Sequence, residues 1–256
     1  MKDIDLPFVG LHAHSTFSLN DGFGYPQEHQ EYAYGNGMNA LALTDHGTCA
    51  GLSYAILNAK KMRDEGKEFK AILGVEAYFI PDVVEWREIY EEIKQDKKSA
   101  RALKKRESTT VAETDGSSRE GSTATLPRYA HLILFAQSQI GLNNIYSIVS
   151  ESHDEKHFYR RPRVDFNLLR KYNEGVICAT ACLGGIVGRE LYSGRDAGLN
   201  EEEIYQNALV KLKTFADIYG DRFYGELQWN SVPEQHIVNK MVIRASEEIG
   251  ISIIST

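Results

Sequence analysis

Short apolar runs recur along the chain and alternate with longer stretches in which apolar residues repeat at helical spacing. An apolar, β-branched run bounded by turn formers is typical of a strand, and a repeat of about 3.6 residues is typical of an amphipathic helix. The apolar runs predict strands at 8–14, 40–45, 71–80, 132–136, 175–181, 223–229 and 251–255. The stretches between them predict helices that include 50–65, 138–152, 200–219 and 233–249.

The alternation of strands and helices predicts an α/β fold. A helical crossover returns the chain so that the next strand lies parallel to the one before it. We therefore expect parallel strands, and seven strand–helix repeats favour a closed or nearly closed barrel over a small open sheet. A doubly wound open sheet is the alternative. A chain of 256 residues has the size that one such domain reaches.

One long polar stretch interrupts this alternation. Residues 83–106 read as a helix that is acidic in its first half and basic in its second, and 107–127 are rich in Ser, Thr and Gly. We interpret residues 82–128 as an insertion after the third strand, with a mobile second part. The basic half of the helix is either an ordinary solvated surface or a contact for phosphate groups.

Composition narrows the class of protein. A net charge of −7 does not fit a protein whose whole surface binds nucleic acid, so any DNA contact would need local basic patches. Three cysteines, an odd count, favour reduced thiols over a disulfide framework. The chain has neither an apolar run of membrane-spanning length nor the pattern of a signal peptide at its start. We therefore expect a cytoplasmic protein with no membrane partner.

Side chains that bind metals follow several of the predicted strands. The carboxyl ends of barrel strands share one rim, so residues at those ends converge. His12 and His14, two positions apart on an extended strand, point to the same side. Imidazole, carboxylate and thiolate groups together suit Zn²⁺ or Mn²⁺, and several of them can hold more than one ion. The residues so placed are His12, His14, Asp21, Asp45, His46, Glu76 and Cys182.

Each of these residues also has a plainer explanation. A histidine in a strand is often a hydrogen-bonded structural residue, Asp21 before a glycine is a turn signal, and Cys182 suits a small buried position. Independent structural roles would not place all of them at successive strand ends. Their joint placement therefore favours a metal site.

An ordered series of motifs gives the chain a family resemblance. It resembles the PHP (polymerase and histidinol phosphatase) domain of the bacterial-type replicative DNA polymerase III alpha subunits, which are C-family DNA polymerases. The similarity covers nearly all of 1–256 apart from the insertion, and it implies a distorted seven-stranded (β/α)7 barrel. The motifs are "LHAHSTFSLNDG", "LALTDHGTCAGL", "ILGVEAYF", "HLILFAQSQIGLNNI", "HFYRRPRVD", "ATACLGGIVGREL" and "FYGELQWN".

The resemblance implies a cluster of up to three divalent ions. The implied ligands are His12, His14, Asp21, His46, Glu76, His131 and Cys182. His131 rests on the resemblance alone, because it opens the fourth predicted strand, at the wrong end for the shared rim of a parallel sheet. Either that strand begins earlier or the chain bends there.

Two further sets of residues are assigned beside the ligands. Asp45 is expected to orient a neighbouring ligand. Arg160, Arg161 and Arg163 follow two aromatic residues, a combination that suits contact with DNA. A surface loop with solvated arginines is the equal alternative.

The resemblance also implies parts that lie beyond Thr256. In the family an Asp-x-His pair follows the seventh strand and completes the cluster, and the polymerase domains come after it. We expect these parts to be supplied by a longer chain or by a separate one, and this chain alone to lack a polymerase site.

Three functions are compatible with the resemblance. The first is a metal-dependent phosphoesterase acting in DNA replication as a 3′–5′ proofreading exonuclease. The second is an inactive scaffold that stabilises the polymerase or docks a partner. The third is a free-standing phosphatase of the histidinol-phosphatase type, which the polymerase-like motifs "HFYRRPRVD" and "FYGELQWN" disfavour.

Overall fold

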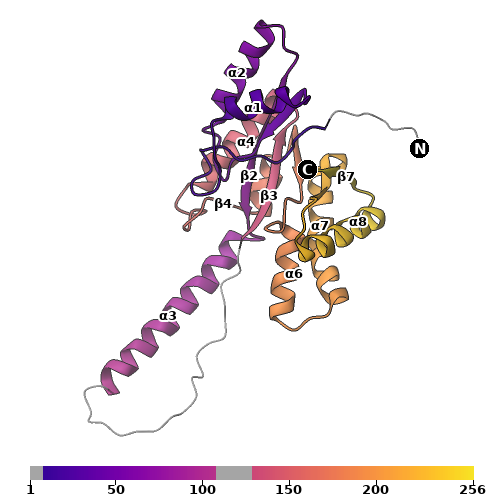
Figure 1. Cartoon of the computed structure of the whole chain (residues 1–256). Coiled ribbons are helices and arrows are strands. Elements are labelled where there is room, and N and C mark those ends of the chain that lie inside the picture. The colour runs from indigo at the N-terminus through magenta and orange to yellow at the C-terminus, as the bar shows by residue number, and fades with distance from the viewer. Residues whose placement is uncertain (1–7, 108–128) are drawn as a thin grey trace.

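The computed structural model describes residues 8–107 and 129–256. The Ser-, Thr- and Gly-rich part of the predicted insertion lies outside these ranges. The charged part forms helix α3 (Val83–Glu107), as predicted, and extends away from the other elements (Figure 1). In the part of the chain that is described, no helix is both long and apolar enough to cross a membrane.

The strands form one mixed sheet of seven strands. Neighbouring strands are parallel, except that β3 runs antiparallel to both β2 and β5. In spatial order the strands are β1 (Ala40–Leu43), β2 (Lys70–Phe79), β3 (Ala130–Ala136), β5 (Val176–Ala179), β6 (Phe223–Leu227) and β7 (Ser252–Ser255), with the short β4 (Arg163–Val164) beside β2.

The prediction of an all-parallel sheet is therefore wrong at β3. The connection between β2 and β3 contains α3 and leaves the sheet after Phe79. The chain re-enters the sheet at Ala130, directly opposite Phe79. When a connection leaves and re-enters a sheet at the same end of its strands, the two strands that it joins run antiparallel, whatever the length of the connection.

The first predicted strand, 8–14, is also wrong as a regular strand. This segment lies along β1 and makes one isolated parallel bridge, between Gly10 and Leu41. Farther along, the backbone N–H of Ala13 donates to the hydroxyl of Thr44, at 3.0 Å, instead of to a backbone carbonyl. A side chain thus takes the place of the main-chain partner, and the ladder does not continue.

The other predicted strands and all four named helices are confirmed, with small shifts at their ends. The helices that correspond to predictions are α2 (Leu52–Asp64), α4 (Gln139–Ser152), α7 (Glu201–Tyr219) and α8 (Pro233–Ile249). Sequence patterning did not name five further elements: α1 (Pro26–Gly35), the short strand β4, α5 (Phe166–Lys171), α6 (Ile186–Asp196) and the short 3₁₀ turn η1 (Gly220–Arg222). In α1 the buried positions include Gln30, so no continuous apolar stripe marks this helix.

The sheet is covered on one face and curls around the other. On β3, Leu132 and Leu134 join the large core formed with the helices. The alternate residues, Ile133 and Phe135, join a small inner cluster. Residues from both ends of the sheet, Ala42 of β1 and Ile254 of β7, contact this same inner cluster. The structure therefore confirms an α/β fold with a curled, barrel-like sheet.

Candidate metal centre

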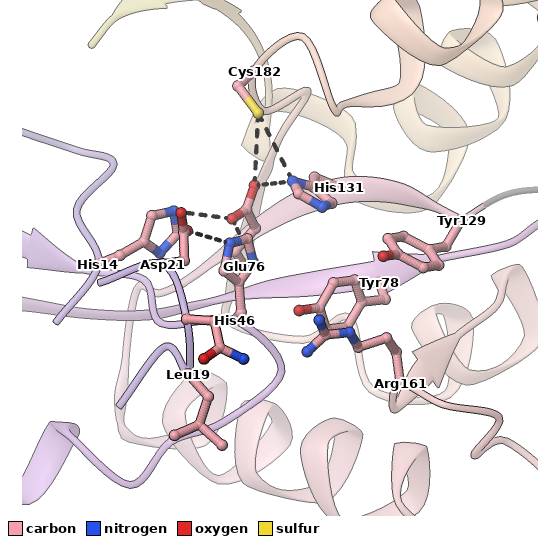
Figure 2. Close-up of a pocket in the computed structure, with 11 residues that line it drawn as sticks. His14, Leu19, Asp21, His46, Glu76, Tyr78, Tyr129, His131, Arg161 and Cys182 are labelled. Atoms are coloured by element: carbon pink, nitrogen blue, oxygen red, sulfur yellow. Dashed lines mark hydrogen bonds and ion pairs between the residues drawn. The ribbon is translucent and has the colours of Figure 1, made fainter. Parts of the chain in front are cut away.

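A pocket lies at the end of the sheet where β2 finishes and β3 begins (Figure 2). Glu76 and Tyr78 of β2 and His131 of β3 reach it from neighbouring strands, because paired residues share one face. Its other lining residues come from loops at the same rim. The full lining is His14, Leu19, Asn20, Asp21, His46, Glu76, Tyr78, Tyr129, His131, Arg161 and Cys182.

Glu76 is the fully buried carboxylate at the centre of this site, and four imidazole rings surround it. Its Oε1 atom lies 3.4 Å from His12 Nε2 and 2.9 Å from His131 Nδ1. Its Oε2 atom lies 3.1 Å from His14 Nε2 and 2.8 Å from His46 Nδ1. Each carboxylate oxygen of Glu76 therefore lies close to the ring nitrogens of two histidines.

The two remaining predicted ligands extend the cluster in opposite directions. Asp21 Oδ2 lies 2.8 Å from the outer nitrogen of His46, Nε2, on the more exposed side. Cys182 Sγ lies 3.8 Å from His131 Nδ1 and 4.0 Å from Glu76 Oε1. The structure thus brings all seven predicted ligands together.

Three overlapping groups of these side chains could each hold a metal ion. Within each group one ligand atom per residue lies within 4.8 Å of the others, and His14, His46 and Glu76 each belong to two groups. The groups are His12–His14–Glu76, His14–Asp21–His46 and His46–Glu76–His131. The shared members make these groups parts of one continuous cluster.

Two unsatisfied atoms support the fit to a metal. His46 Nδ1 and Glu76 Oε2 are buried and 2.8 Å apart, yet neither makes a hydrogen bond of normal geometry. Buried polar atoms without a partner are costly, and a cation between converging lone pairs would satisfy both. Nitrogen, oxygen and sulfur ligands in one cluster are also the donor set that suits divalent transition metals.

The charges of these groups depend strongly on one another. Burial alone would raise the pKa of Glu76, but its close contacts with the surrounding histidines hold it far below its usual range. Burial alone would lower the pKa of His12, but its bonds to Glu226 and Glu76 raise it to about 10. Burial and the charge of Glu76 raise the pKa of the Cys182 thiol to about 12. Metal ions would therefore replace protons on binding.

The antiparallel direction of β3 explains how His131 reaches the site. The strand begins at Ala130, two residues earlier than predicted, and its first residues lie at the rim where the neighbouring parallel strands end. The backbone N–H of His131 donates to the carbonyl of Gly184, at 2.8 Å. The residue expected from the family resemblance is thus placed by strand direction, which apolar patterning does not reveal.

The turn after β5 brings Cys182 close to His131. Gly184 donates its backbone N–H to Cys182 Sγ, at 3.3 Å. A Cβ atom on Gly184 would lie only 2.9 Å from His131 Nδ1, and one on Gly185 would lie 2.1 Å from the carbonyl oxygen of Thr180. Two glycines at these positions let the turn pack directly against the imidazole.

Asp45 is buried beneath the loop that links two of the ligands, His14 and Asp21. Its Oδ1 atom accepts hydrogen bonds from the backbone N–H of Ser15, at 2.6 Å, and from the hydroxyl of Ser18, at 2.9 Å. The Ser18 hydroxyl in turn accepts the backbone N–H of His46, at 3.0 Å. Among the described residues, Asp45 therefore holds the backbone around the predicted ligands and makes no hydrogen bond to their rings.

The three predicted arginines lie in different surroundings. Arg161 lines the pocket, with its guanidinium 5.5 Å from the ring centre of Tyr78. Arg160 is exposed and is not among the lining residues. Arg163 is only 2% exposed, stacks on Trp86 at 3.9 Å, and donates from Nε to the carbonyl of His157. Of the three, only Arg161 faces the metal ligands.

Sequence reasoning missed several residues at or beside the site, among them two tyrosines and a buried glutamate. Tyr78 and Tyr129 line the pocket on the side away from His14 and Asp21 (Figure 2). Glu226 of β6 is buried and accepts a hydrogen bond from His12. The sequence did contain a signal for Glu226, because it is a carboxylate within a short apolar strand. Burying such a group without a partner is costly, so its presence there indicates a specific partner.

Known proteins are similar to this chain both in sequence and in fold. A profile of the PHP domain family matches residues 10–230. The chain is 34% identical over 250 residues to DNA polymerase III subunit alpha of Aquifex aeolicus, covering 97% of this chain and 18% of that protein. It is 31% identical over 246 residues to the same subunit of Borreliella burgdorferi, covering 96% of this chain and 17% of that protein. The chain thus spans less than a fifth of these relatives.

A solved structure supports the fold independently. A Bifidobacterium adolescentis protein described as a metal-dependent phosphoesterase superposes with a TM-score of 0.51 at 12% identity. The match covers 96% of this chain and 85% of that one. At this identity the likeness concerns the arrangement of strands and helices.

Proposed function

Because this chain belongs to the PHP domain family, we propose that its rim pocket binds a cluster of divalent metal ions and hydrolyses phosphate esters. The observation that carries the proposal is Glu76, a buried carboxylate that meets four imidazoles within 3.4 Å. Uncharged packing would not place so many ionisable groups around one buried charge. We propose Zn²⁺ or Mn²⁺ and up to three ions, one for each group of ligands.

The protein groups would divide the work of hydrolysis. Bound ions of this kind activate water and neutralise charge on a phosphate oxygen. Glu76, His14 and His46 each belong to two of the three groups and would each help to hold the ions of both. Asp45, by holding Ser15 and Ser18, would keep the loop between His14 and Asp21 in place. This loop lies on the open side of the pocket.

We propose DNA as the substrate. Arg161 supplies a cation opposite the ligands, and guanidinium groups bind phosphate oxygens through charged hydrogen bonds. Tyr129 is only partly buried at this pocket and offers a ring on which a nucleobase can stack. Tyr78 is 4% exposed and packs against both Tyr129 and His46, so it supports the pocket wall. Arg160 would contact the strand outside the pocket. Arg163 would act indirectly, by holding the segment that carries Arg161.

The relatives suggest the biological setting. They are named as DNA polymerase III subunit alpha, and this chain spans less than a fifth of their length. We propose that the domain works in DNA replication as a cytoplasmic 3′–5′ proofreading exonuclease. It would act together with polymerase domains present in the same chain or in a separate one.

A scaffold role is the second candidate. Leu19 at the pocket and Phe23 in the same loop are 77% and 90% exposed. Exposed apolar side chains that lie close together are typical of contact surfaces. In a scaffold these residues would be covered by a partner, and the metal ligands would serve only to stabilise the domain.

The experiment that tests the proposed function compares His14→Ala with wild type. His14 belongs to two of the three ligand groups, so its loss should weaken metal binding by more than the roughly 10–100-fold typical of residues outside the ligand set. We expect release of nucleotides from the 3′ end of a labelled oligonucleotide to be abolished. His236, exposed on α8, provides the control His236→Ala, which should behave as wild type.

The outcomes separate the candidates. Nucleotide release that is metal-dependent in wild type and lost only in His14→Ala supports the exonuclease. Metal binding without hydrolysis in wild type would favour the scaffold. Equal hydrolysis in wild type and His14→Ala would overturn the assignment of the site.

A further inference from the structure

Glu226 is a second buried carboxylate next to the metal centre. It lies on β6 and is 1% exposed. Its backbone N–H donates to the hydroxyl of Thr180, at 2.9 Å, which ties the strand to the end of β5. Because Glu226 lies two residues after Tyr224, a member of the inner cluster, its side chain points to the inner face of the sheet.

Among the described residues, all hydrogen bonds to the Glu226 carboxylate are accepted by one of its oxygens, Oε1. Oε1 lies 2.8 Å from His12 Nδ1, 3.1 Å from Gln228 Nε2 and 2.9 Å from the hydroxyl of Thr256. Oε2 is buried and has no hydrogen-bond partner. A buried carboxylate held on one side only is costly, so its position calls for a specific role.

The contact with His12 determines how this ring faces the metal centre. When Nδ1 carries the proton and donates it to Glu226, the other nitrogen, Nε2, presents its lone pair. Nε2 is the atom that lies 3.4 Å from Glu76 Oε1, inside the His12–His14–Glu76 group. His14 has a weaker outer contact, because its Nδ1 meets only the Ser18 hydroxyl, at 3.5 Å, among the recorded hydrogen bonds.

We infer that Glu226 is a positioning residue that fixes the tautomer and the ring orientation of His12 and makes Nε2 a stronger ligand. Carboxylates behind metal-binding histidines act in this way in general. The inference rests on the proposed metal-binding function. It adds a residue that contacts neither the substrate nor the ions and acts through His12.

The two substitutions Glu226→Gln and Glu226→Ala separate positioning from packing. The glutamine keeps an oxygen that accepts the Nδ1–H of His12, whereas alanine removes it. Asp165 provides the control Asp165→Asn, since it is equally buried but accepts from backbone N–H groups of Val83 and Leu168, away from the ligands. Thermal unfolding of the metal-free proteins reports whether each variant folds.

Two measurements on folded variants test the inference. Zn²⁺ affinity, from competition with a chromophoric chelator, should fall about 10–100-fold in Glu226→Ala and less in Glu226→Gln. Nitrogen-15 NMR of the zinc-loaded protein, with His12 assigned by substitution, should show protonated Nδ1 and zinc-bound Nε2 in wild type and in Glu226→Gln. In Glu226→Ala the His12 signals should broaden or change tautomer.

The results that would overturn the inference are distinct. Unchanged affinity and an unchanged His12 tautomer in Glu226→Ala would refute it while leaving the metal site intact. Loss of one whole equivalent of zinc in Glu226→Gln would make Glu226 a direct ligand. An equal loss of affinity in Asp165→Asn would reduce the effect to packing. Absence of both zinc and manganese binding in wild type would refute the proposed function itself, and the inference with it.

Discussion

Glu76 explains why so many ionisable side chains can share one buried site. Without metal, contacts with the surrounding imidazoles hold the pKa of Glu76 down, and Glu226 and Glu76 hold the pKa of His12 up. His46 shows the same upward direction, since the effects of Glu76 and Asp21 outweigh burial. A bound divalent ion would also supply positive charge and would require the protons on these rings to leave. We therefore expect protons and metal ions to compete for the site.

This exchange makes stability depend on pH in a predictable direction. The pKa of His12 in the fold, about 10, lies above its ordinary value of 6.5, because Glu226 and Glu76 outweigh the effect of burial. The protonated ring therefore stabilises the metal-free fold fully below about pH 6.5, and this contribution is lost as pH rises toward about 10. The Tm advantage of chelator-treated wild type over His12→Ala should shrink across this range.

The stabilisation that zinc provides should depend on pH in the opposite direction. Because the ion competes with protons for the ring nitrogens, the rise in Tm caused by zinc should grow as pH increases over the same interval. Differential scanning calorimetry with chelator or with zinc measures both trends. If the Tm of metal-free wild type exceeded that of metal-free His12→Ala by an amount that increases with pH, the assigned charge state of His12 would be wrong.

Among the elements, the turn between β5 and α6 brings the predicted thiol ligand to the imidazole of His131. Gly184 and Gly185 let Cys182 Sγ come within 3.8 Å of His131 Nδ1. The motif "CLGG" is therefore a packing requirement as well as a source of one ligand. The opposing element, the start of β3, is fixed by its pairing with β2.

Gly184→Ala tests this packing. The added Cβ would lie 2.9 Å from His131 Nδ1, so the ring or the turn must shift. We expect a loss of stability of roughly 1–3 kcal/mol, as for overpacked positions, together with weaker zinc binding. Gly35→Ala is the matched control, because a Cβ there has nothing within 4 Å. Denaturant unfolding and chelator competition measure the two effects, and a Gly184→Ala protein with wild-type values for both would contradict the proposed packing.

The sequence predicted the elements better than their arrangement. Apolar runs located six of the strands, and all of these except β7 contain buried residues. They could not give the direction of β3, because periodicity is the same in both directions along a strand. They misassigned 8–14, where Thr44 takes a hydrogen bond from the backbone of Ala13. α6 begins in the glycine-rich turn and carries Gly188 and Gly194, which weakened its helical signal.

The candidate site shows the same division. His12, His14, Asp21, His46 and Cys182 could be assigned to one rim from strand ends alone, together with Glu76. His131 needed either the family resemblance or the direction of its strand. The partners behind the ligands, Glu226 above all, depend on which residues of distant segments meet, and a single sequence does not contain that information.

Over the molecule as a whole, the metal centre and the main core occupy different parts of one curled sheet. The helices cover its outer face, and the inner face carries apolar residues in one part and Glu76, His131 and Glu226 in another. Only the first turns of α3 join a buried cluster, through Val83 and Trp86. The large apolar core therefore contributes stability that does not depend on the predicted metal ligands, and we expect the His12→Ala/His14→Ala variant to fold.

This separation makes metal content the most direct test of the metal centre. Elemental analysis after gel filtration in metal-supplemented, then metal-free buffer gives the number of Zn²⁺ or Mn²⁺ ions per chain. We expect wild type and His236→Ala to retain at least one ion, and the folded double variant His12→Ala/His14→Ala to lose ions that wild type keeps. No bound metal in wild type, or equal metal in the double variant, would show that these residues do not form a metal centre.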